Sequence, residues 1–382
     1  MKSLFITLFL TFSIASAQAE PIQFSLPMPP APEVAAKSYI LTDVASGQTL
    51  IQQNADQRIE PASLTKLMTA YITFSAIKQG RISTTQTLPV SEKAWRTEGS
   101  RMFIDLKTPV TVNELIRGMI VQSGNDACIT LAEGIAGSEA TFAQLMNQEA
   151  ARLGMKNTHF VNSTGLPDPQ HYTTAYDLSL LASAIIRDFP EYYPLYSIKE
   201  YRYNNITQPN RNRLLWLDPT VDGMKTGHTE SAGFCLITSA KRDNRRLISV
   251  VLGTASDNAR TMESQKVLNY GFQFFDSVRM YAKGQTVANL RAWKGTQNTL
   301  KAGFLKDTFI VVPKGQYARL KVTMTSTQPL LAPIKVGQKV GTIRLTLDDK
   351  PVADLPLVSL EEVGVGNIFG RAWDSIKLTF TK

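Results

Sequence analysis

Residues 61–72 read Pro-Ala-Ser-Leu-Thr-Lys-Leu-Met-Thr-Ala-Tyr-Ile, and this stretch predicts a helix with one buried face. Its apolar side chains recur at helical spacing; they are Leu64, Leu67, Met68, Tyr71 and Ile72. Ser63 and Lys66 are three residues apart and share a side of that helix. Ser63 lies at the helix start, where unpaired N–H groups and the positive end of the dipole gather. These features predict a serine nucleophile with a lysine beside it.

Two further motifs follow later in the chain, Ser123-Gly124-Asn125 and Lys225-Thr226-Gly227. The hydroxyl of Ser123 is suited to relay a proton to a leaving amine, and the amide of Asn125 is suited to fix Lys66 and hold a substrate amide. A Ser-Gly-Asn before a helix is, on its own, typical of a turn. The three motifs together, more than any one of them, favour nucleophilic catalysis.

The third motif predicts a binding edge on a strand. Lys225 and Thr226 are suited to bind a carboxylate, and Gly227 is suited to let a substrate backbone approach closely. The N–H of His228 is expected to complete an oxyanion hole with the N–H of Ser63. His228 is therefore expected to act through its backbone more than through its imidazole.

Lys66 can take the proton of Ser63 only as a neutral amine, whereas a free lysine titrates near ~10.4. Burial and a nearby cation both lower the pKa of a lysine, and Lys225 is the expected second cation. The predicted catalytic residues are therefore Ser63, Lys66, Ser123, Asn125 and Lys225.

Two similar motifs elsewhere in the chain are rejected. Ser75-Ala76-Ile77-Lys78 lies in the interior of the predicted helix, where a serine has no special backbone around it. Ser256-Asp257-Asn258 comes after Lys225, which is the wrong order, and is predicted to form a strand-to-helix loop.

The N-terminus predicts export. Lys2 precedes a short apolar run at 4–14, and small residues at 15–19 offer a cleavage site, so residues 1–19 are expected to be a signal peptide. The formal net charge of +9 suits an anionic membrane surface or wall polymer. Nucleic acid is disfavoured as a partner, because the chain is exported and has no basic run or nucleic-acid motif.

Neither a metal nor a cofactor is expected. The three histidines His159, His171 and His228 lack metal-ligand spacing. Cys128 and Cys235 fall in a predicted helix and a predicted strand and are interpreted as small core residues. A disulfide between these cysteines is left open.

The alternation of patterns predicts two domains and a tail. Strands are expected at 39–43, 49–53, 221–226, 234–240 and 247–253. Helical patterns fill most of 63–189 and return at 263–275. This arrangement predicts an antiparallel sheet built from both ends of the domain with helices between, an α+β (α/β layered) catalytic domain over residues 20–280.

Residues 281–364 differ from the first domain in amino-acid composition. They are rich in Val, Thr and Leu and are interrupted by Gly and Pro, which predicts a small all-β sandwich domain. Strands are expected at 309–313, 320–326 and 341–347.

Residues 365–382 predict an amphipathic helix. One arc of this helix gathers Ile368, Phe369, Ala372, Trp373, Ile376 and Phe380. The other side carries Asp374 and basic residues, with Leu378 as the large apolar exception. The helix is too short to span a bilayer and suits anchoring on an anionic membrane surface. Packing of the helix on the β domain is the alternative.

The three motifs in this order resemble those of the penicillin-recognising active-serine enzymes. The likeness extends over nearly the whole chain, including the stretches 171–177, 208–212 and 221–229. The chain is similar to the low-molecular-mass penicillin-binding proteins, the serine D-alanyl-D-alanine carboxypeptidases.

The resemblance implies a reaction and a location. Enzymes of this family acylate the serine with the peptide stem of peptidoglycan, release the terminal D-alanine and hydrolyse the acyl-enzyme, and penicillins acylate the same serine. The resemblance implies that Arg211 and Arg260 recognise the terminal carboxylate. It also implies that the C-terminal helix holds the enzyme on the periplasmic face of the inner membrane, with the β domain as a spacer.

Three alternatives are weighed against this function. A D,D-endopeptidase would cut peptidoglycan cross-links with the same residues. A class A β-lactamase has Ser-Asp-Asn as its second motif and a Glu-x-x-Leu-Asn loop, neither of which occurs here between Ser123 and Lys225. A wall-binding protein with a dead site is disfavoured by three intact motifs.

Overall fold

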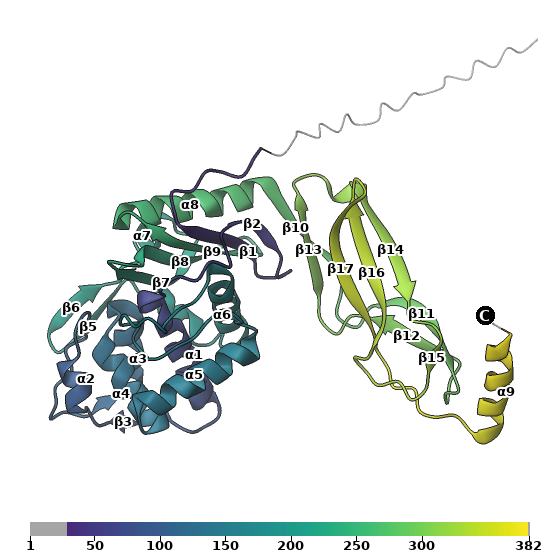
Figure 1. Cartoon of the computed structure of the whole chain (residues 1–382), viewed down its shortest axis with the longest axis horizontal. Helices are drawn as coiled ribbons and strands as arrows, with labels where there is room; N and C mark the ends of the chain where they lie inside the picture. Colours follow the sequence, from purple (N-terminus) through teal and green to yellow (C-terminus); the bar gives the residue numbers. More distant parts are fainter. Residues whose placement is uncertain (1–28, 381–382) are drawn as a thin grey trace, which may run out of the picture.

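The computed structural model of the protein describes residues 29–380, which form two domains lying side by side (Figure 1). The predicted signal peptide, residues 1–19, lies outside the described residues. The first domain carries the predicted catalytic motifs, and the second ends in a helix far from the first domain (Figure 1).

A five-stranded antiparallel sheet with the order β2-β1-β9-β8-β7 organises the first domain. Its strands are β1 (Ser38–Asp43), β2 (Thr49–Gln53), β7 (Val221–Thr229), β8 (Gly233–Arg242) and β9 (Arg245–Thr254). β1 pairs with β9, with Ser38 opposite Leu252 and Asp43 opposite Leu247. The strands predicted at 39–43 and 49–53 form an antiparallel pair, and the predicted assembly of the sheet from both ends of the domain is confirmed.

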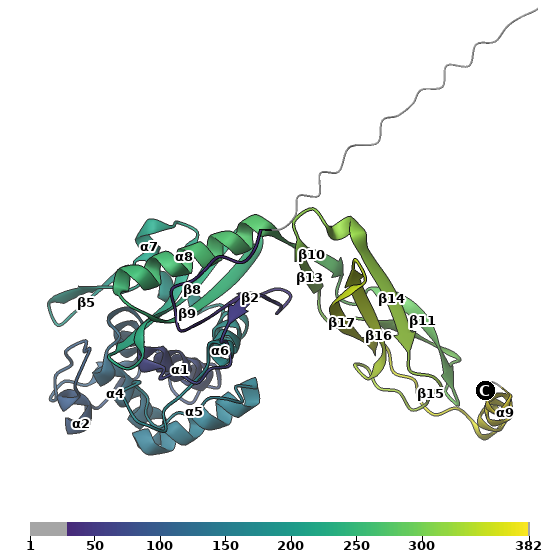
Figure 2. The same cartoon turned by 45° about the horizontal axis from the view of Figure 1, so that its top comes forward.

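Most helices cover one face of this sheet, while α7 and α8 cover the other (Figures 1 and 2). The first set is η1 (Ala62–Thr65), α1 (Lys66–Lys78), α2 (Glu92–Arg96), α3 (Val112–Arg117), the π-helical turn η2 (Gly118–Gln122), α4 (Asn125–Ala136), α5 (Glu139–Leu153), α6 (Ala175–Asp188) and η3 (Tyr193–Ser197). The second set is α7 (Leu214–Leu217) and α8 (Asp257–Phe274). Two small strand pairs complete the domain, β3 (Thr87–Leu88) with β4 (Val110–Thr111) and β5 (Glu200–Tyr203) with β6 (Ile206–Pro209).

Helix α1 lies in the middle of the larger core. Ten of its 13 residues are buried, so the prediction of a single buried face is wrong. A helix surrounded by other elements has no solvent side to keep polar. Each fully buried large apolar side chain, such as Leu67 or Phe74, stabilises the fold by about 2 kcal/mol. This packing gives Ser63 and Lys66 a rigid support.

Helix α8 begins earlier than the predicted 263–275. The side chain of Ser256 accepts a hydrogen bond from the N–H of Ala259 and caps the helix, and Asp257 lies in the first turn. Ser256-Asp257-Asn258 is therefore a helix start, and its prediction as a loop is wrong for the last two residues. A serine cap and an acidic first turn both stabilise the N-terminus of a helix.

The second domain consists of two packed sheets around a separate core. β10 (Phe275–Tyr281) follows α8 directly and pairs with β13 (Thr308–Pro313). The larger sheet has the order β14-β16-β17-β12-β11-β15. Its strands are β11 (Thr286–Trp293), β12 (Thr299–Gly303), β14 (Leu320–Ser326), β15 (Leu330–Leu331), β16 (Lys339–Leu347) and β17 (Lys350–Ser359), with the short helix η4 (Tyr317–Arg319) before β14. The predicted boundary between residues 280 and 281 falls inside β10.

The last helix of the described residues is α9 (Ile368–Thr379). Asn367 caps it by accepting a hydrogen bond from the N–H of Gly370, 2.8 Å away. Asp374 is buried and accepts a hydrogen bond of 2.6 Å from the N–H of Lys294, so this side of the helix faces the β domain. Between residues 29 and 380, none of the helices combines the length and the apolar character needed to cross a membrane.

The apolar arc of α9 points into solvent. Each of its five large side chains is at least 52 % exposed; they are Ile368, Phe369, Trp373, Ile376 and Phe380. Leu378, the apolar exception, lies four residues after Asp374 on the face toward the β domain and is half-buried. The position of Leu378 is therefore explained by the side of the helix that packs.

Candidate active site

A pocket of about 470 Å³ opens beside strand β7 at the edge of the sheet. It is lined by Ser63, Gly99, Ser100, Ser123, Arg211, Thr226, Gly227, His228, Phe234 and Arg260. Lys66, Asn125 and Lys225 are buried beneath it. The structure thus brings together residues from all three motifs. A larger cavity of about 810 Å³, where the two domains meet, contains none of the predicted site residues.

Lys66 is the first residue of α1, and its ammonium group has three partners. Its Nζ donates hydrogen bonds to Ser63 Oγ at 2.9 Å, to Asn125 Oδ1 at 2.7 Å and to the carbonyl of Thr164 at 2.6 Å. The contacts with Ser63 and Asn125 agree with the roles expected from the sequence. Thr164 was not expected, because it contributes only a backbone carbonyl.

The second motif forms a sharp turn between η2 and α4. Ser123 has a left-handed backbone (φ +61°), which turns its hydroxyl toward Lys225, whose Nζ lies 2.9 Å from Ser123 Oγ. Asn125 is the first residue of α4, and its Nδ2 donates to the carbonyl of Glu98 at 2.7 Å. That bond leaves Oδ1 of Asn125 facing Lys66.

Gly227 allows a close approach between two segments of the protein itself. A Cβ at this position would lie 3.1 Å from the carbonyl oxygen of Pro61 and 3.2 Å from Leu64 Cγ. The glycine therefore lets β7 pack against the segment that carries Ser63. The expected approach of a substrate backbone to Gly227 stays a prediction.

The pKa values of both lysines are lowered. Burial lowers the pKa of Lys66 to about 8; Cys128 and Asp126 oppose this shift, and the Arg211 guanidinium adds to it. Burial, followed by the charges of Lys66 and Arg211, holds the pKa of Lys225 well below its ordinary value.

Arg211 is a cation near Lys66 to which the sequence analysis gave no such role, and its charge lowers the pKa of both lysines. The two lysines also interact, since the charge of Lys66 lowers the pKa of Lys225. The expectation that Lys225 is the second cation for Lys66 stays a prediction, while an arginine keeps its charge.

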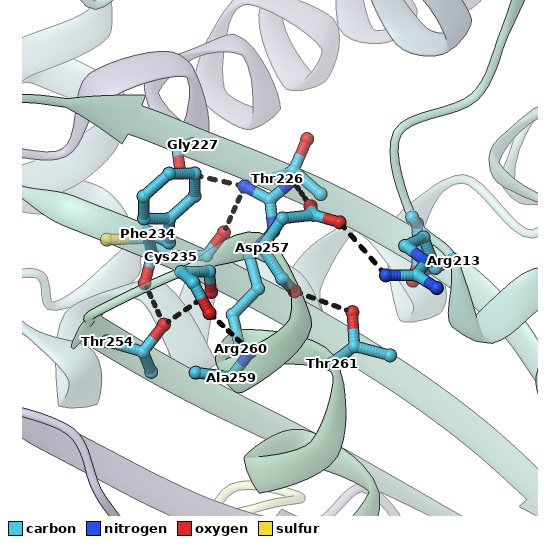
Figure 3. Close-up of polar contacts among 12 residues, drawn as sticks. Arg213, Thr226, Gly227, Phe234, Cys235, Thr254, Asp257, Ala259, Arg260 and Thr261 are labelled. Atoms are coloured by element: carbon cyan, nitrogen blue, oxygen red, sulfur yellow. Dashed lines mark hydrogen bonds and ion pairs between the residues drawn. The ribbon is translucent and has the colours of Figure 1, made fainter.

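Arg260 and Arg211 both line the pocket, but their surroundings differ. Arg260 reaches from α8 to the sheet, donates to the carbonyls of Gly227 (3.2 Å) and Cys235 (3.5 Å), and pairs with Asp257 (Figure 3). Asp257 also contacts Arg213 at 3.5 Å (Figure 3). Arg211 has no hydrogen bond or ion pair with any other residue of the described chain, 29–380. Arg211 is therefore the more available cation.

His228 is exposed, and its ring lies against Phe234 with 4.0 Å between the ring centroids. His171, from the stretch 171–177, is buried and contacts Thr65 Oγ1 through Nε2 at 2.8 Å. Burial lowers the pKa of His171 to about 4, so this histidine is neutral at ordinary pH. Cys128 and Cys235 are both free and buried, as expected for small core residues.

The site contains two lysines of lowered pKa, Lys66 and Lys225, each in contact with a serine hydroxyl. It lies where helices pack against the edge strand of an antiparallel sheet. This arrangement is that of the active-serine enzymes that recognise penicillin. Comparison with known proteins narrows this class. The chain belongs to the D-alanyl-D-alanine carboxypeptidase family, whose sequence model matches residues 26–256. Residues 275–365 match the C-terminal domain of penicillin-binding protein 5.

Individual relatives agree with this assignment. The D-alanyl-D-alanine carboxypeptidase DacA of Haemophilus influenzae is 42% identical over 385 residues, covering 99% of this chain and 97% of that protein. The crystal structures of penicillin-binding protein 5 from H. influenzae align with a TM-score of 0.84 at 42% identity, over 88% of this chain and 99% of that one. The ampicillin-bound penicillin-binding protein D2 of Listeria monocytogenes aligns with a TM-score of 0.59 at 32% identity, over 64% of this chain and 100% of that one. The chain is accordingly a serine-type D-alanyl-D-alanine carboxypeptidase.

Proposed function

We propose that Ser63 is the residue acylated by the peptide stems of peptidoglycan and by penicillins, and that the terminal D-alanine leaves through this acyl-enzyme. The observation that carries the proposal is the 2.9 Å contact between Lys66 Nζ and Ser63 Oγ at a pocket lined by all three motifs. No cofactor takes part in this chemistry.

Each proton has an acceptor in the proposed reaction. Ser63 Oγ attacks the carbonyl carbon of the penultimate residue while its proton passes to the neutral amine of Lys66. The N–H groups of Ser63 and His228 stabilise the resulting oxyanion. Ser123, beside Lys225, delivers a proton to the leaving amine as the C–N bond breaks, and the proton that Lys66 took from Ser63 replaces it, so both groups return to their starting states. Water then hydrolyses the ester: its oxygen stays on the released acyl group, and one of its protons restores the hydroxyl of Ser63 as the ester C–O bond breaks.

The terminal carboxylate of the substrate is bound, in this proposal, by Arg211 together with Thr226. Arg211 lines the pocket without an internal partner, whereas the guanidinium of Arg260 is occupied by Gly227, Cys235 and Asp257. Arg260 is therefore assigned to supporting the end of β7.

In this proposal, residues 20–280 form the catalytic domain, residues 281–364 form a spacer domain, and residues 365–382 form the membrane anchor. The exposed apolar arc of α9, far from the first domain, supports peripheral binding to an anionic bilayer on the periplasmic face of the inner membrane (Figure 1). The buried Asp374 accounts for the orientation of the helix.

Ser63→Ala tests the nucleophile, with Ser75→Ala as the matched control. Ser75 lies on the same helix, where its Oγ accepts a hydrogen bond from Gln79 and lines a different pocket. Ser63→Ala is expected to abolish both the mass increase with penicillin and the release of D-alanine from a pentapeptide, and Ser75→Ala to retain both. Labelling that survives Ser63→Ala contradicts the assignment. Cleavage of a cross-linked stem in preference to the pentapeptide would favour the endopeptidase instead.

A further inference from the structure

A turn between α5 and α6 lies against the start of α1. The carbonyl of Thr164 accepts a hydrogen bond from Lys66 Nζ at 2.6 Å, and the carbonyl of Ser163 accepts one from Thr69 Oγ1 at 2.7 Å. Lys66 and Thr69 are three residues apart and share one side of the helix. Two successive carbonyls of the turn therefore dock on the helix that carries the catalytic lysine.

The Thr164 carbonyl determines where the lone pair of neutral Lys66 points. A neutral amine has two N–H donors and one lone pair. The Thr164 carbonyl and Asn125 Oδ1 accept but cannot donate, so they take both N–H groups. The lone pair is left for the third neighbour, the hydroxyl of Ser63. This is the orientation in which Lys66 can take the proton of Ser63.

One side chain holds the turn in shape. Asn162 Oδ1 accepts hydrogen bonds from the N–H of Thr164 (3.1 Å), the hydroxyl of Thr164 (3.0 Å) and the N–H of Gly165 (2.7 Å). Asn162 Nδ2 donates to the carbonyl of Leu166 at 3.0 Å. Both the amide before the Thr164 carbonyl and the amide after it are thus bound to the same oxygen.

Two other contacts tie the turn to its surroundings. The carboxylate of Glu139 accepts hydrogen bonds from the N–H and the hydroxyl of Ser163, at 3.0 and 2.6 Å. Gly165 has a left-handed backbone (φ +86°), and a Cβ there would lie 1.8 Å from the carbonyl oxygen of Ala62. The turn therefore lies directly against the residue before Ser63.

We propose that Asn162 is a positioning residue of the enzyme, which holds the Thr164 carbonyl on Lys66 so that the lone pair of the neutral amine faces Ser63. This inference rests on the proposed roles of Ser63 and Lys66 and adds a residue that does not touch the substrate.

The pH dependence separates positioning from mere structural support. The charged and titratable groups that act on Lys66 are Cys128 and Asp126 on α4, Arg211 before α7, Lys225 on β7 and His171 before α6. Losing the carbonyl removes a hydrogen bond that favours the ammonium form, so the pKa of Lys66 should fall. A merely loosened fold would admit water and raise this pKa toward its ordinary value.

The test measures the rate of acylation by a fluorescent penicillin from pH 6 to 10 in the full-length protein. Asn162→Ala is expected to lower the acylation rate at high pH by about tenfold, the equivalent of one hydrogen bond. It is also expected to shift the acid limb, the part of the profile in which the rate rises with pH, to lower pH. Asn162→Asp keeps the three accepted bonds and should stay within about twofold of the parent rate, with its acid limb at or above that of the parent.

Asn147→Ala is the matched control. Asn147 is also half-buried, and it binds the N–H and carbonyl of Phe160 at 2.8 Å each, two residues before Asn162, without touching the turn. This variant should keep the parent rate and pH profile. The inference is overturned if a folded Asn162→Ala acylates at the parent rate, or if its acid limb stays in place or rises. A parent protein that is not acylated at all contradicts the proposed function instead.

Discussion

Lys66 combines full burial with three hydrogen bonds, and this combination sets the working pH of the site. Burial is the main reason that the pKa of Lys66 falls to about 8. Burial lowers the pKa of His171 to about 4 and raises that of Cys128 to about 12, so neither group titrates between pH 6 and 10. A change in the acylation rate around pH 8 is therefore not due to either of these two groups.

The acylation of Ser63 should rise with pH through a midpoint of about 8. The base must be unprotonated, so below this midpoint each pH unit is expected to reduce the rate by about tenfold. The second-order rate constant for a fluorescent penicillin, measured from pH 6 to 9.5, checks this expectation. A rate that is flat across the range would show that Lys66 is not the base.

At the scale of elements, α4 and the preceding segment 98–104 fix the second motif together. The carboxylate of Asp126, in the first turn of α4, accepts hydrogen bonds from the N–H groups of Met102 (3.0 Å), Phe103 (2.9 Å) and Ile104 (3.3 Å). The N–H of Asn125 donates to the carbonyl of Ser100 at 2.7 Å. One buried carboxylate thus binds the segment that contributes Gly99 and Ser100 to the pocket.

Asp126→Ala should lower the free energy of unfolding by about 3 kcal/mol, because it leaves four backbone N–H groups, including that of Ala127, without their acceptor. It should also slow penicillin acylation, since Asn125 loses its support. Urea denaturation and the labelling rate measure the two effects. Asp105→Ala is the control: the side chain of this exposed residue of the same region accepts a single hydrogen bond within the described chain, from the N–H of Lys107. Equal losses from both variants would contradict the role given to Asp126.

A structural feature could be predicted from the sequence where the residues that determine it are close together in the chain. The sheet strands, the lysine beside Ser63 and the apolar arc of α9 are signalled by neighbouring residues, and all appear in the structure. Thr164 lies 98 residues from Lys66 and contributes a carbonyl that any residue type would supply. The stretch Asn162–Gly165 has the composition of a turn, but nothing in it indicates which helix it faces.

The same reasoning explains what the sequence analysis got wrong or left out. Helix α1 is buried on all sides because helices α4, α5 and α6 pack around it, and no local sequence pattern contains their positions. The contact of Gly227 with the segment around Pro61 was not anticipated, because that segment lies more than 160 residues away in the chain. Such long-range contacts cannot be read from the residues next to a glycine.

At the scale of the whole molecule, the two domains are joined by direct contacts at the end of the β1–β2 hairpin. Arg245 pairs with Asp43 at 3.0 Å and donates to the carbonyl of Phe275 at 2.5 Å, and Gln48 Oε1 accepts from the N–H of Val311 at 2.6 Å. The second domain extends from this junction and ends in α9 (Figure 1). A membrane bound by α9 would therefore lie at the opposite end of the molecule from the pocket.

A chain that ends at Gly364 should stay soluble, bind no anionic vesicles and keep its carboxypeptidase activity, because it loses the exposed arc and none of the pocket. Two point variants refine the test without shortening the chain. Phe369 is 86 % exposed, so Phe369→Ser should weaken vesicle binding by about tenfold or more. Leu378 faces the β domain, so Leu378→Ser should bind like the parent. Sedimentation with vesicles of anionic lipid measures all three. If the shortened chain binds as well as the parent, or if Leu378→Ser loses binding while Phe369→Ser keeps it, the exposed arc of α9 is not the anchor.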